Sequence, residues 1–433
     1  MNYPYLFQKK LLFFLLSIGT VCSALDRAHF YSTCPMWEEP RFEKDYLGSF
    51  DVTIFTGSAC EGHGVEECNP ICSQSQYETP LLDIYGRHNM HLLGENVPGK
   101  DLTLFTDITL TNLSLIPSRN EFGHLSFCGK FENWQTYFTY TQNIKRGFFF
   151  QIDLPVRSLE ISCIGYRDLS PSEPEIPNIN NPTWQSFLTI FDDILTQYNL
   201  NICDYKCTHV GDLSLLLGWT KNHEKTEVFD FVDVTIKGGV LCPTGAKRNP
   251  NKVFSLPNGY DGHWGFPFSF DIAFGAYEWL TMGVHLETII LTKKAKELRM
   301  KTALGQSGFI KLAKGCATVR PGPIVRCGLF AKADHFAAGL SFLIAYSYAR
   351  KGDDRICPSN TQVFSSLIAE SDEMFREWKM HTVHFKAEYD FTRENSRVGT
   401  RFGIFYNVYA RGQRTFQTST VGANVGFDVS LDF

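Results

Sequence analysis

The last residues of the chain alternate strictly between apolar and polar positions. Val425, Phe427, Val429, Leu431 and Phe433 occupy the odd positions, and a Gly, Asp or Ser occupies each even one. This period of two predicts a strand of about ten residues with one apolar and one polar face. Such a strand suits an antiparallel sheet half buried in a soluble protein, and it also suits a tilted strand that crosses a lipid bilayer beside a polar lumen.

The same alternation recurs towards the N-terminus and predicts a series of further strands. We expect them at 400–411, 383–391, 340–348, 323–334, 282–290, 266–274, 232–236, 213–219, 148–154, 122–140, 102–115, 81–93 and 46–56. The phase of the pattern slips within 122–140, which predicts a β-bulge there. The total is about 14 strands, with a range of about 12 to 16, and membrane barrels of this kind have an even number.

Short and long connections alternate between these strands. From the C-terminus they run as short (392–398), long (351–377), short (334–338), long (292–322), short (277–280), long (242–263), short (221–227), long (166–208) and short (143–147). The brief connection 412–419 is the exception on the long side. Short turns at one rim and longer loops at the other are typical of barrels in outer membranes, whereas a soluble sandwich has no reason to alternate in this way. The chain therefore predicts an all-β, antiparallel, up-and-down transmembrane barrel over residues 46–433.

Two of the long connections show helical spacing of apolar residues. One helix is expected after Asn181-Pro182, where a capping residue is followed by proline at the first helical position. A second is expected after Asn360, with its apolar side running to Trp378. These helices either narrow the mouth of the barrel or pack on each other or on its rim to bury their apolar faces.

The N-terminus indicates export. Lysines at 9 and 10 precede an apolar run over 11–21, and small residues follow at 22–24, so residues 1–24 read as a cleaved secretory signal. Residues 25–45 precede the first strand and either fold into the lumen as a plug or lie in the periplasm. No later run of ~18 apolar residues offers a transmembrane helix.

Composition agrees with alternating faces. Aromatic residues make up 14% of the chain, including 37 Phe, yet the mean hydropathy is only −0.15. The formal net charge is −5, and removal of Lys9 and Lys10 with the signal takes it to −7. This balance gives no reason to expect a nucleic-acid partner.

The final strand, with its terminal Phe, resembles the closing strand of bacterial outer-membrane β-barrels. In that class the C-terminal aromatic strand is an assembly signal, which here would comprise Phe427, Val429, Leu431 and Phe433. The resemblance implies an outer-membrane location in a Gram-negative-type envelope. It also implies contact with membrane lipid and with the barrel-assembly machinery, and it is compatible with a homo-oligomer.

Cysteines are numerous for an exported chain. There are 13, and 12 remain after loss of Cys22 with the signal. An even number in an oxidising compartment favours disulfides. The candidates are Cys60, Cys68, Cys72, Cys203 and Cys207. Neither cluster has the spacing of a zinc knuckle, so we expect no metal and no other cofactor.

Charged residues on the polar faces are expected to line the lumen, because a row of charges is costly unless it is solvated or paired. They are Asp153, Asp233, Lys237, Asp271, His285, Glu287, Arg326, Lys332, His384, Lys386, Glu388, Asp390, Arg401 and Arg411. Acids and bases in one lumen either tune which solutes pass or lock a closed barrel by salt bridges. They form no recognised catalytic signature such as Gly-x-Ser-x-Gly, so we do not expect an enzyme.

A segment around the fourth outer loop is similar to channels for hydrophobic compounds, of the fatty-acid-transporter and aromatic-degradation types. The similar elements are Gly238-Gly239-Val240-Leu241-Cys242-Pro243-Thr244-Gly245, then Leu256-Pro257-Asn258-Gly259 and Gly265. The Asn-Pro-Ala element of the fatty-acid transporters is absent near the N-terminus. We therefore expect an outer-membrane channel for small solutes, including hydrophobic compounds. The alternative is a surface structural or adhesion protein with disulfide-stabilised loops and a closed barrel.

Overall fold

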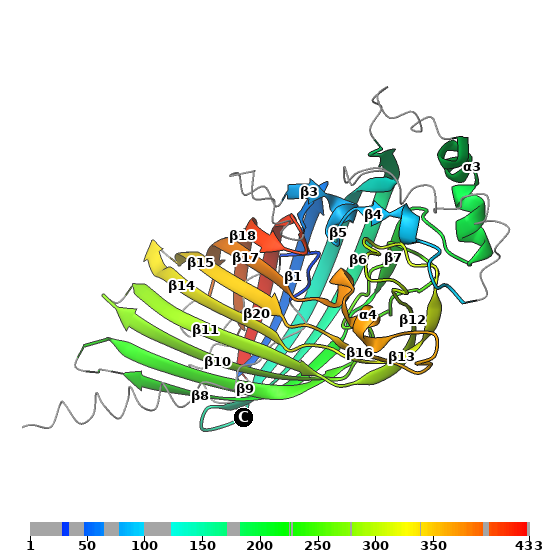
Figure 1. Cartoon of the computed structure of the whole chain (residues 1–433). Helices are drawn as coiled ribbons and strands as arrows, with labels where there is room; N and C mark the ends of the chain where they lie inside the picture. Colours follow the sequence, from blue (N-terminus) through cyan, green and yellow to red (C-terminus); the bar gives the residue numbers. More distant parts are fainter. Residues whose placement is uncertain are drawn as a thin grey trace, which may run out of the picture.

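The computed structural model describes residues 28–33, 47–64, 78–98, 123–170, 182–224, 226, 228–277, 279–337, 339–392 and 398–430. Twelve long strands form one antiparallel sheet in the order β5-β1-β20-β18-β17-β15-β14-β11-β10-β9-β8-β6. Pairing of β6 with β5 closes this sheet into a barrel (Figure 1). The predicted all-β antiparallel up-and-down barrel is confirmed, and twelve strands lie within the expected range.

The barrel strands follow one another along the chain. They are β1 (Leu47–Ala59), β5 (His124–Asn143), β6 (Phe148–Asp168), β8 (Leu213–Glu224), β9 (Phe231–Cys242), β10 (Gly265–Ala276), β11 (Leu280–Leu291), β14 (Ile324–Ala337), β15 (Leu340–Lys351), β17 (Trp378–Asp390), β18 (Val398–Gln413) and β20 (Ser419–Ser430). Each corresponds to a strand expected from the alternation. The bulge predicted in 122–140 is present, since the register of β5 against β6 shifts between Cys128 and Lys130.

The remaining elements lie in the long connections or pair with the barrel edge. They are β2 (Glu61–His63), β3 (Glu78–Pro80), η1 (Leu81–Asp83), β4 (His88–Asn89), η2 (Met90–Leu92), α3 (Pro182–Gln197), β7 (Tyr205–Val210), β12 (Lys294–Arg299), β13 (Lys314–Arg320), β16 (Arg355–Pro358), α4 (Ser366–Glu370), η3 (Glu373–Phe375) and β19 (Thr415–Phe416). β12, β13 and β16 form a small sheet of their own, and β19, β2 and β3 form another. Among the described residues, no helix has both the length and the apolar character needed to cross a bilayer.

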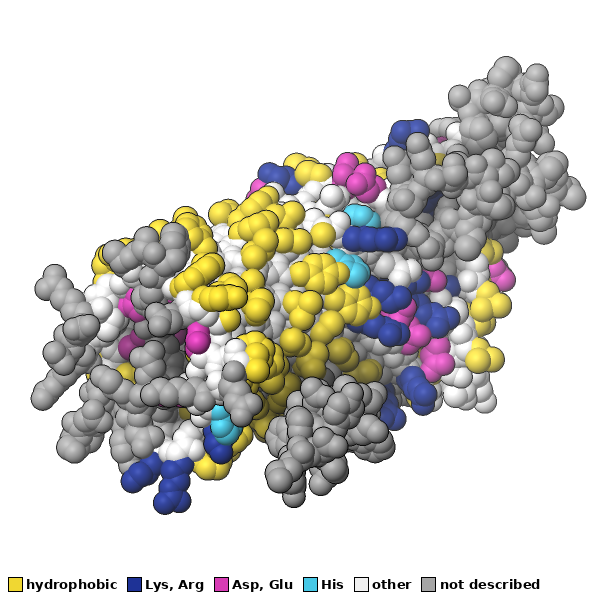
Figure 2. Space-filling model, turned by 90° about the vertical axis from the view of Figure 1, so that its left-hand side faces the viewer, with side chains coloured by type: hydrophobic (Ala, Val, Ile, Leu, Met, Phe, Trp, Pro, Cys, Tyr) yellow, Lys and Arg dark blue, Asp and Glu magenta, His cyan; other side chains and the backbone are white. Residues whose placement is uncertain are grey.

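The outer wall of the barrel is apolar. Large hydrophobic side chains such as Phe50, Phe268, Ile344, Ile404 and Phe427 are each about two-fifths exposed or more, and they sit at the alternate positions opposite the buried polar ones. Figure 2 shows a broad band of hydrophobic side chains on one face of the molecule. A soluble protein rarely exposes so large a continuous apolar surface.

The hydrophobic core lies at the long-loop end of the barrel, above the polar interior. Here β5 and β6 extend past their neighbours, and the long connections fold over them (Figure 1). The core includes Phe131 from the wall, Phe254 and Phe309 from loops, and Phe191 and Ile194 from α3, all buried in one cluster. The helix expected after Asn181-Pro182 is thus confirmed, and it packs its apolar side into this core.

Two expected elements are corrected by the structure. Residues 81–93 form short 3-10 helices and a two-residue strand instead of a barrel strand, because Leu81, Leu82 and Ile84 are all fully buried and leave no solvent-facing side. The helix expected after Asn360 shrinks to the five residues of α4, and Trp378 begins β17. The strand expected at 102–115 lies outside the described residues, as do the signal segment 1–24 and the terminal Leu431 and Phe433.

Candidate functional site

Most of the charged residues expected in the lumen have buried side chains on the inner side of the barrel wall. Nine are less than a tenth exposed: Asp153, Lys237, Asp271, His285, Glu287, Arg326, His384, Glu388 and Arg401. Asp233, Lys332, Lys386 and Asp390 are half-buried. Arg411 is exposed, because a register shift between His381 and Thr382 in the β17–β18 pair puts it opposite His381 on the outer side. Arg411 is therefore corrected from a lumen residue to an exterior one.

The buried charges are paired across neighbouring strands. On β10, β11 and β14, His285 lies between two carboxylates: its Nδ1 bonds to Asp271 and its Nε2 is 3.1 Å from Glu287, whose other neighbour is Arg326 at 3.3 Å. On β17, Lys386 and Glu388 are 2.7 Å apart. Pairing compensates part of the cost of removing these charges from water.

Arg401 joins the first and last strands of the barrel. Its guanidinium reaches Asp51 on β1 at 3.0 Å and Asp428 on β20 at 3.1 Å, and it also donates to the Ser49 hydroxyl at 3.2 Å. β1 and β20 are the first and last barrel strands in chain order, they pair with each other, and their junction is called the closing seam below. The ion pair therefore fastens the closing seam from the inside.

A chain of hydrogen bonds crosses four strands, β15, β17, β18 and β20, and ends on the N-terminal segment. His384 bonds to Ser347 at 2.7 Å and to Asn407 at 2.9 Å, Asn407 donates to Thr420 at 2.9 Å, and the Thr420 and Thr33 hydroxyls are 3.1 Å apart. This Ser–His–Asn order resembles a nucleophile with its base. All three side chains are less than 5% exposed, so the arrangement braces the wall and does not present a nucleophile to a substrate.

Residues 28–33 lie inside the barrel at its long-loop end. Tyr31 is fully buried; its hydroxyl donates to the carbonyl of Pro257, and its own carbonyl accepts from Thr418. The backbone of Phe416 donates to the carbonyl of Phe30, and Asn133 on β5 donates to Ser32. The segment thus contacts the wall at β5 and β20, the two neighbours of β1, and it also contacts the loop 243–264.

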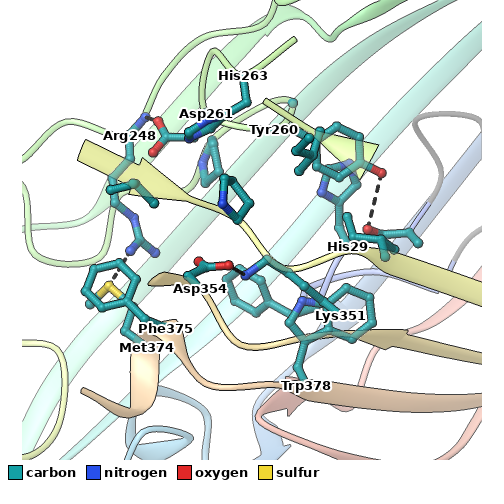
Figure 3. A pocket seen from close by; sticks show the side chains of 18 of the residues that line it. His29, Arg248, Tyr260, Asp261, His263, Lys351, Asp354, Met374, Phe375 and Trp378 are labelled. Carbon is teal, nitrogen blue, oxygen red and sulfur yellow. Dashed lines mark hydrogen bonds and ion pairs between the residues drawn. The ribbon is translucent and has the colours of Figure 1, made fainter. Parts of the chain in front are cut away.

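One side of this segment forms the wall of a cavity of ≈ 130 Å³ (Figure 3). Its aromatic lining comes from the segment itself, from the outer loops and from the first residue of β17. These aromatic residues are Phe30, Tyr31, Tyr85, Tyr260, Phe375 and Trp378. His29 stacks between Tyr31 and Tyr260, with ring centroids 4.8 and 4.9 Å apart. Aromatic rings here supply a large apolar surface with hydroxyl, imidazole and indole groups at its edge.

Charged groups line the other side of the same cavity. Lys296 pairs with Asp261 and lies 3.4 Å from His263 Nε2, and Lys351 pairs with Asp354. Burial would raise the pKa of Asp261, but Lys296 brings it below its ordinary range. Burial, assisted by Lys296, lowers the pKa of His263 to about 4. His263 is therefore neutral at pH 7, and its Nδ1 lies 2.7 Å from the Thr292 carbonyl.

Two residues missing from the sequence-based site hold the loop over this cavity. Arg157 on β6 is fully buried and bonds to Gln135, Tyr137 and the carbonyl of Asn258. Asp212 accepts from the backbone N–H groups of Gly245 and Tyr260. Arg157 continues the alternation of Gln151 and Asp153 by two more pleats, so the pattern held a signal for it. Asp212 sits between two strands, where no periodicity applies.

The expected disulfides are not found in the described part of the chain. Cys60, Cys203 and Cys207 are free thiols there, while Cys68 and Cys72 lie outside it. Cys207 belongs to the extended strand β7 and Cys203 precedes it by two residues. Within the described residues, no group of three or more metal-ligating side chains lies close enough to hold an ion.

Comparison with known proteins gives no relative by sequence: no family model and no curated protein matches the chain. Several solved structures align with it. An outer membrane channel from Pseudomonas putida F1 gives a TM-score of 0.46 at 8% identity, with 90% of this chain and 99% of that one covered. The Pseudomonas putida toluene transporter TodX gives 0.33 at 12% identity, over 90% and 91% of the two chains. The translocator domain of autotransporter NalP from Neisseria meningitidis gives 0.34 at 10%, over 90% and 89%.

These neighbours are outer-membrane barrels of different functions. At such TM-scores the resemblance carries no argument about what this chain binds or transports. The class of this chain rests on its own topology, which is a closed antiparallel barrel of twelve strands.

Proposed function

We propose that this protein is an outer-membrane channel for small solutes, held closed by its own N-terminal segment. The proposed location is supported by the inverted distribution of side chains, with exposed Phe, Ile and Leu around the wall and buried charges within it. The hydrocarbon region of a bilayer holds no water to form hydrogen bonds with backbone polar groups. A closed barrel is one of the two structures that pair all of these groups internally. Residues 1–24 would direct export, and the C-terminal strand would direct assembly.

The observation that carries the proposal is the cavity at the outer end. It is bounded on one side by residues 28–33 and on the other by loops that reach the outside, so a solute arriving through the loops would meet it before the polar interior. We assign the segment 25–45 the role of a plug, of which 28–33 is the described part. Displacement of this segment would join the cavity to the lumen below.

The cavity suits a small molecule with an aromatic or other apolar body and an anionic or hydrogen-bonding group. Its ≈ 130 Å³ is close to the ~150 Å³ of an apolar cavity that accepts benzene. Arg248, Lys296 and Lys351 lie on its charged side with Asp261 and Asp354, which gives three fixed cations and two carboxylates. A compound such as benzoate would place its ring among the aromatic residues and its carboxylate beside the cations.

Influx of benzoate into vesicles carrying the mature chain, residues 25–433, tests this function. Tyr31→Ala removes the buried ring that anchors the segment, and deletion of a buried aromatic side chain costs ~3–5 kcal/mol. When ~1.4 kcal/mol of this cost destabilises the closed state relative to the open state, the ratio of open to closed barrels, and with it the influx, rises by about tenfold. Tyr389→Ala on the exposed wall is the matched control and leaves influx unchanged. Equal influx in wild type and Tyr31→Ala would contradict the plug.

The second candidate is a closed structural or adhesion protein. The densely paired interior favours it, since Arg401, His285 and Glu388 are all engaged by neighbouring side chains. Free thiols at Cys60, Cys203 and Cys207 remove the loop disulfides that this alternative invoked. A barrel that stays impermeable after Tyr31→Ala, with its fold intact, would favour this candidate.

A further inference from the structure

The outer wall carries a basic patch just above its apolar band, on three neighbouring strands. We define the patch as Arg350 on β15, Lys379 on β17 and Arg411 on β18. Arg350 and Lys379 face each other directly in the register, and Arg411 stands opposite His381, the next outward residue of β17. The Arg350 side chain is 51% exposed and that of Lys379 is 34% exposed. The three cations therefore form one exterior cluster drawn from residues 61 positions apart in the chain.

Positive charge exceeds negative charge where Arg350 and Lys379 meet. Glu377 pairs with both of them, at 2.6 Å from Lys379, so that two cations share one carboxylate. Asp353, which accepts from the Glu377 backbone N–H, has its own partner in Arg376. Arg411 is a third basic residue, on the next strand. By contrast, exterior lysines on the opposite side of the barrel pair one to one with acids: Lys206 with Glu160, and Lys130 with Glu132. Figure 2 shows Lys and Arg side chains, with His and some acids, gathered at one margin of the hydrophobic band.

An aromatic layer lies between the patch and the apolar band. Tyr346 and Tyr348 occupy the outward positions of β15 directly below Arg350. The Tyr346 hydroxyl bonds to the His381 ring, and the Tyr348 and His381 rings are 4.8 Å apart. Tyrosine is enriched at the level of lipid headgroups, where one end of the ring is apolar and the other is wet. The layer places the basic patch at headgroup height on the side of the long loops.

A groove of ≈ 620 Å³ lies lower on the same strands. Small side chains at Ala331, Ala333 and Ala387 leave space on the outer wall, and Phe342 and Phe385 border it. Arg350 lies six positions after the groove residue Ile344 on β15, a distance of ~20 Å along the strand. At a tilt of ~40° this is ~15 Å of depth, or half of a ~30 Å hydrocarbon core.

From these features we propose that the exterior of β14, β15, β17 and β18 is a binding site for a phosphorylated, multiply acylated lipid of the outer leaflet. The basic patch binds its phosphate, the tyrosines border its headgroup, and an acyl chain one leaflet long reaches the groove. Cations near a membrane surface attract anionic headgroups, and guanidinium groups match phosphate geometry. The inference rests on the proposed membrane location but not on solute passage.

Binding of fluorescent bisphosphorylated lipid A to the folded mature chain in uncharged detergent tests the site. Each surface cation contributes about a fivefold change in affinity. The double variant Arg350→Gln/Arg411→Gln should therefore weaken binding by about 30-fold. The matched control Lys130→Gln/Lys206→Gln, on the opposite wall, should leave it unchanged.

Two further arms separate the parts of the site. Ala387→Trp fills the groove and should weaken binding of lipid A while every cation is retained. Inorganic phosphate, which has no acyl chain, should not displace the lipid at matched concentration. Equal binding by wild type and the Arg350/Arg411 variant, an equal loss in the Lys130/Lys206 control, tight binding of dephosphorylated lipid A, or displacement by phosphate would each overturn the proposal. Benzoate influx through the Arg350/Arg411 variant should remain at the wild-type level, so failure of this site and failure of the channel are distinguishable.

Discussion

Removal of the Arg401 side chain should destabilise the barrel more than any other single change among its paired charges. Arg401→Met leaves Asp51 and Asp428 facing each other across the closing seam, without the guanidinium that lies 3.0 and 3.1 Å from them. The three side chains are at most 10% exposed, so water screens them little. Loss of one member of a buried ion pair costs ~3–5 kcal/mol, because the remaining charge stays buried.

The triple variant Arg401→Met/Asp51→Asn/Asp428→Asn is the matched control. It removes the same guanidinium but leaves no uncompensated carboxylate, and replacement of a whole buried ion group by neutral side chains is often close to neutral. We expect it to recover most of the stability lost in Arg401→Met.

Equilibrium urea unfolding of the chain in lipid vesicles, followed by tryptophan fluorescence, measures both variants. We expect a loss of ~3–5 kcal/mol in the free energy of unfolding for Arg401→Met and recovery to within ~1–2 kcal/mol for the triple variant. A loss below ~1 kcal/mol, typical of a solvent-exposed pair, would refute the inward placement of Arg401. Failure of the triple variant to recover would show that packing, and not charge, sets the cost.

Three further outcomes are expected. Burial lowers the pKa of His263 to about 4 from 6.5, so between these two pH values only the unfolded chain binds a proton at this residue. The contribution of His263 to the free energy of unfolding, measured by urea titration, should therefore be constant above pH 6.5 and decrease towards pH 4. His263→Asn should remove this decrease. Gly147, with φ +82°, lies in the short turn 143–147, and a Cβ there would collide with the Thr220 carbonyl. Gly147→Val should therefore lower the free energy of unfolding by ~1–3 kcal/mol. An unchanged unfolding midpoint would contradict this turn geometry. Cys203 is an exposed free thiol, so a maleimide reagent should label it in intact cells without prior reduction. Labelling only after reduction would show that Cys203 forms a disulfide after all.

Alternation alone predicted the twelve barrel strands because each strand separates an apolar outer face from a polar inner face. The prediction failed where that condition fails. Residues 81–93 have the apolar content of a strand, but Leu81 and Leu82 are adjacent and both fully buried. This segment therefore packs on the core of the loops and has no polar face. The helix after Asn360 was predicted too long. Trp378 fits the helical spacing of the apolar residues before it, but in the structure it is the first residue of β17.

Bulges limit how far a face can be followed along a strand. Alternation along β18 assigns Arg401, Asn407 and Arg411 to one side, and the structure agrees for the first two. The register shift in the β17–β18 pair then adds a residue and moves Arg411 to the outer wall. Gly412, directly after Arg411, is the one sequence signal at this point, because a Gly inside a strand often marks a bulge. The cavity residues Arg248, Asp261 and Lys296 are brought together by loop folding, which strand periodicity does not describe.

In the proposed function, the N-terminal segment closes the barrel. Single-channel conductance of the refolded chain in planar bilayers tests it most directly, with residues 25–433 compared with residues 34–433. We predict rare openings for the longer chain and steady open steps for the shorter one, because removal of residues 28–33 takes away the bonds to Pro257, Thr418 and Asn133. A shorter chain that folds, as shown by a heat-dependent shift on gels, and still conducts no current would contradict the claim.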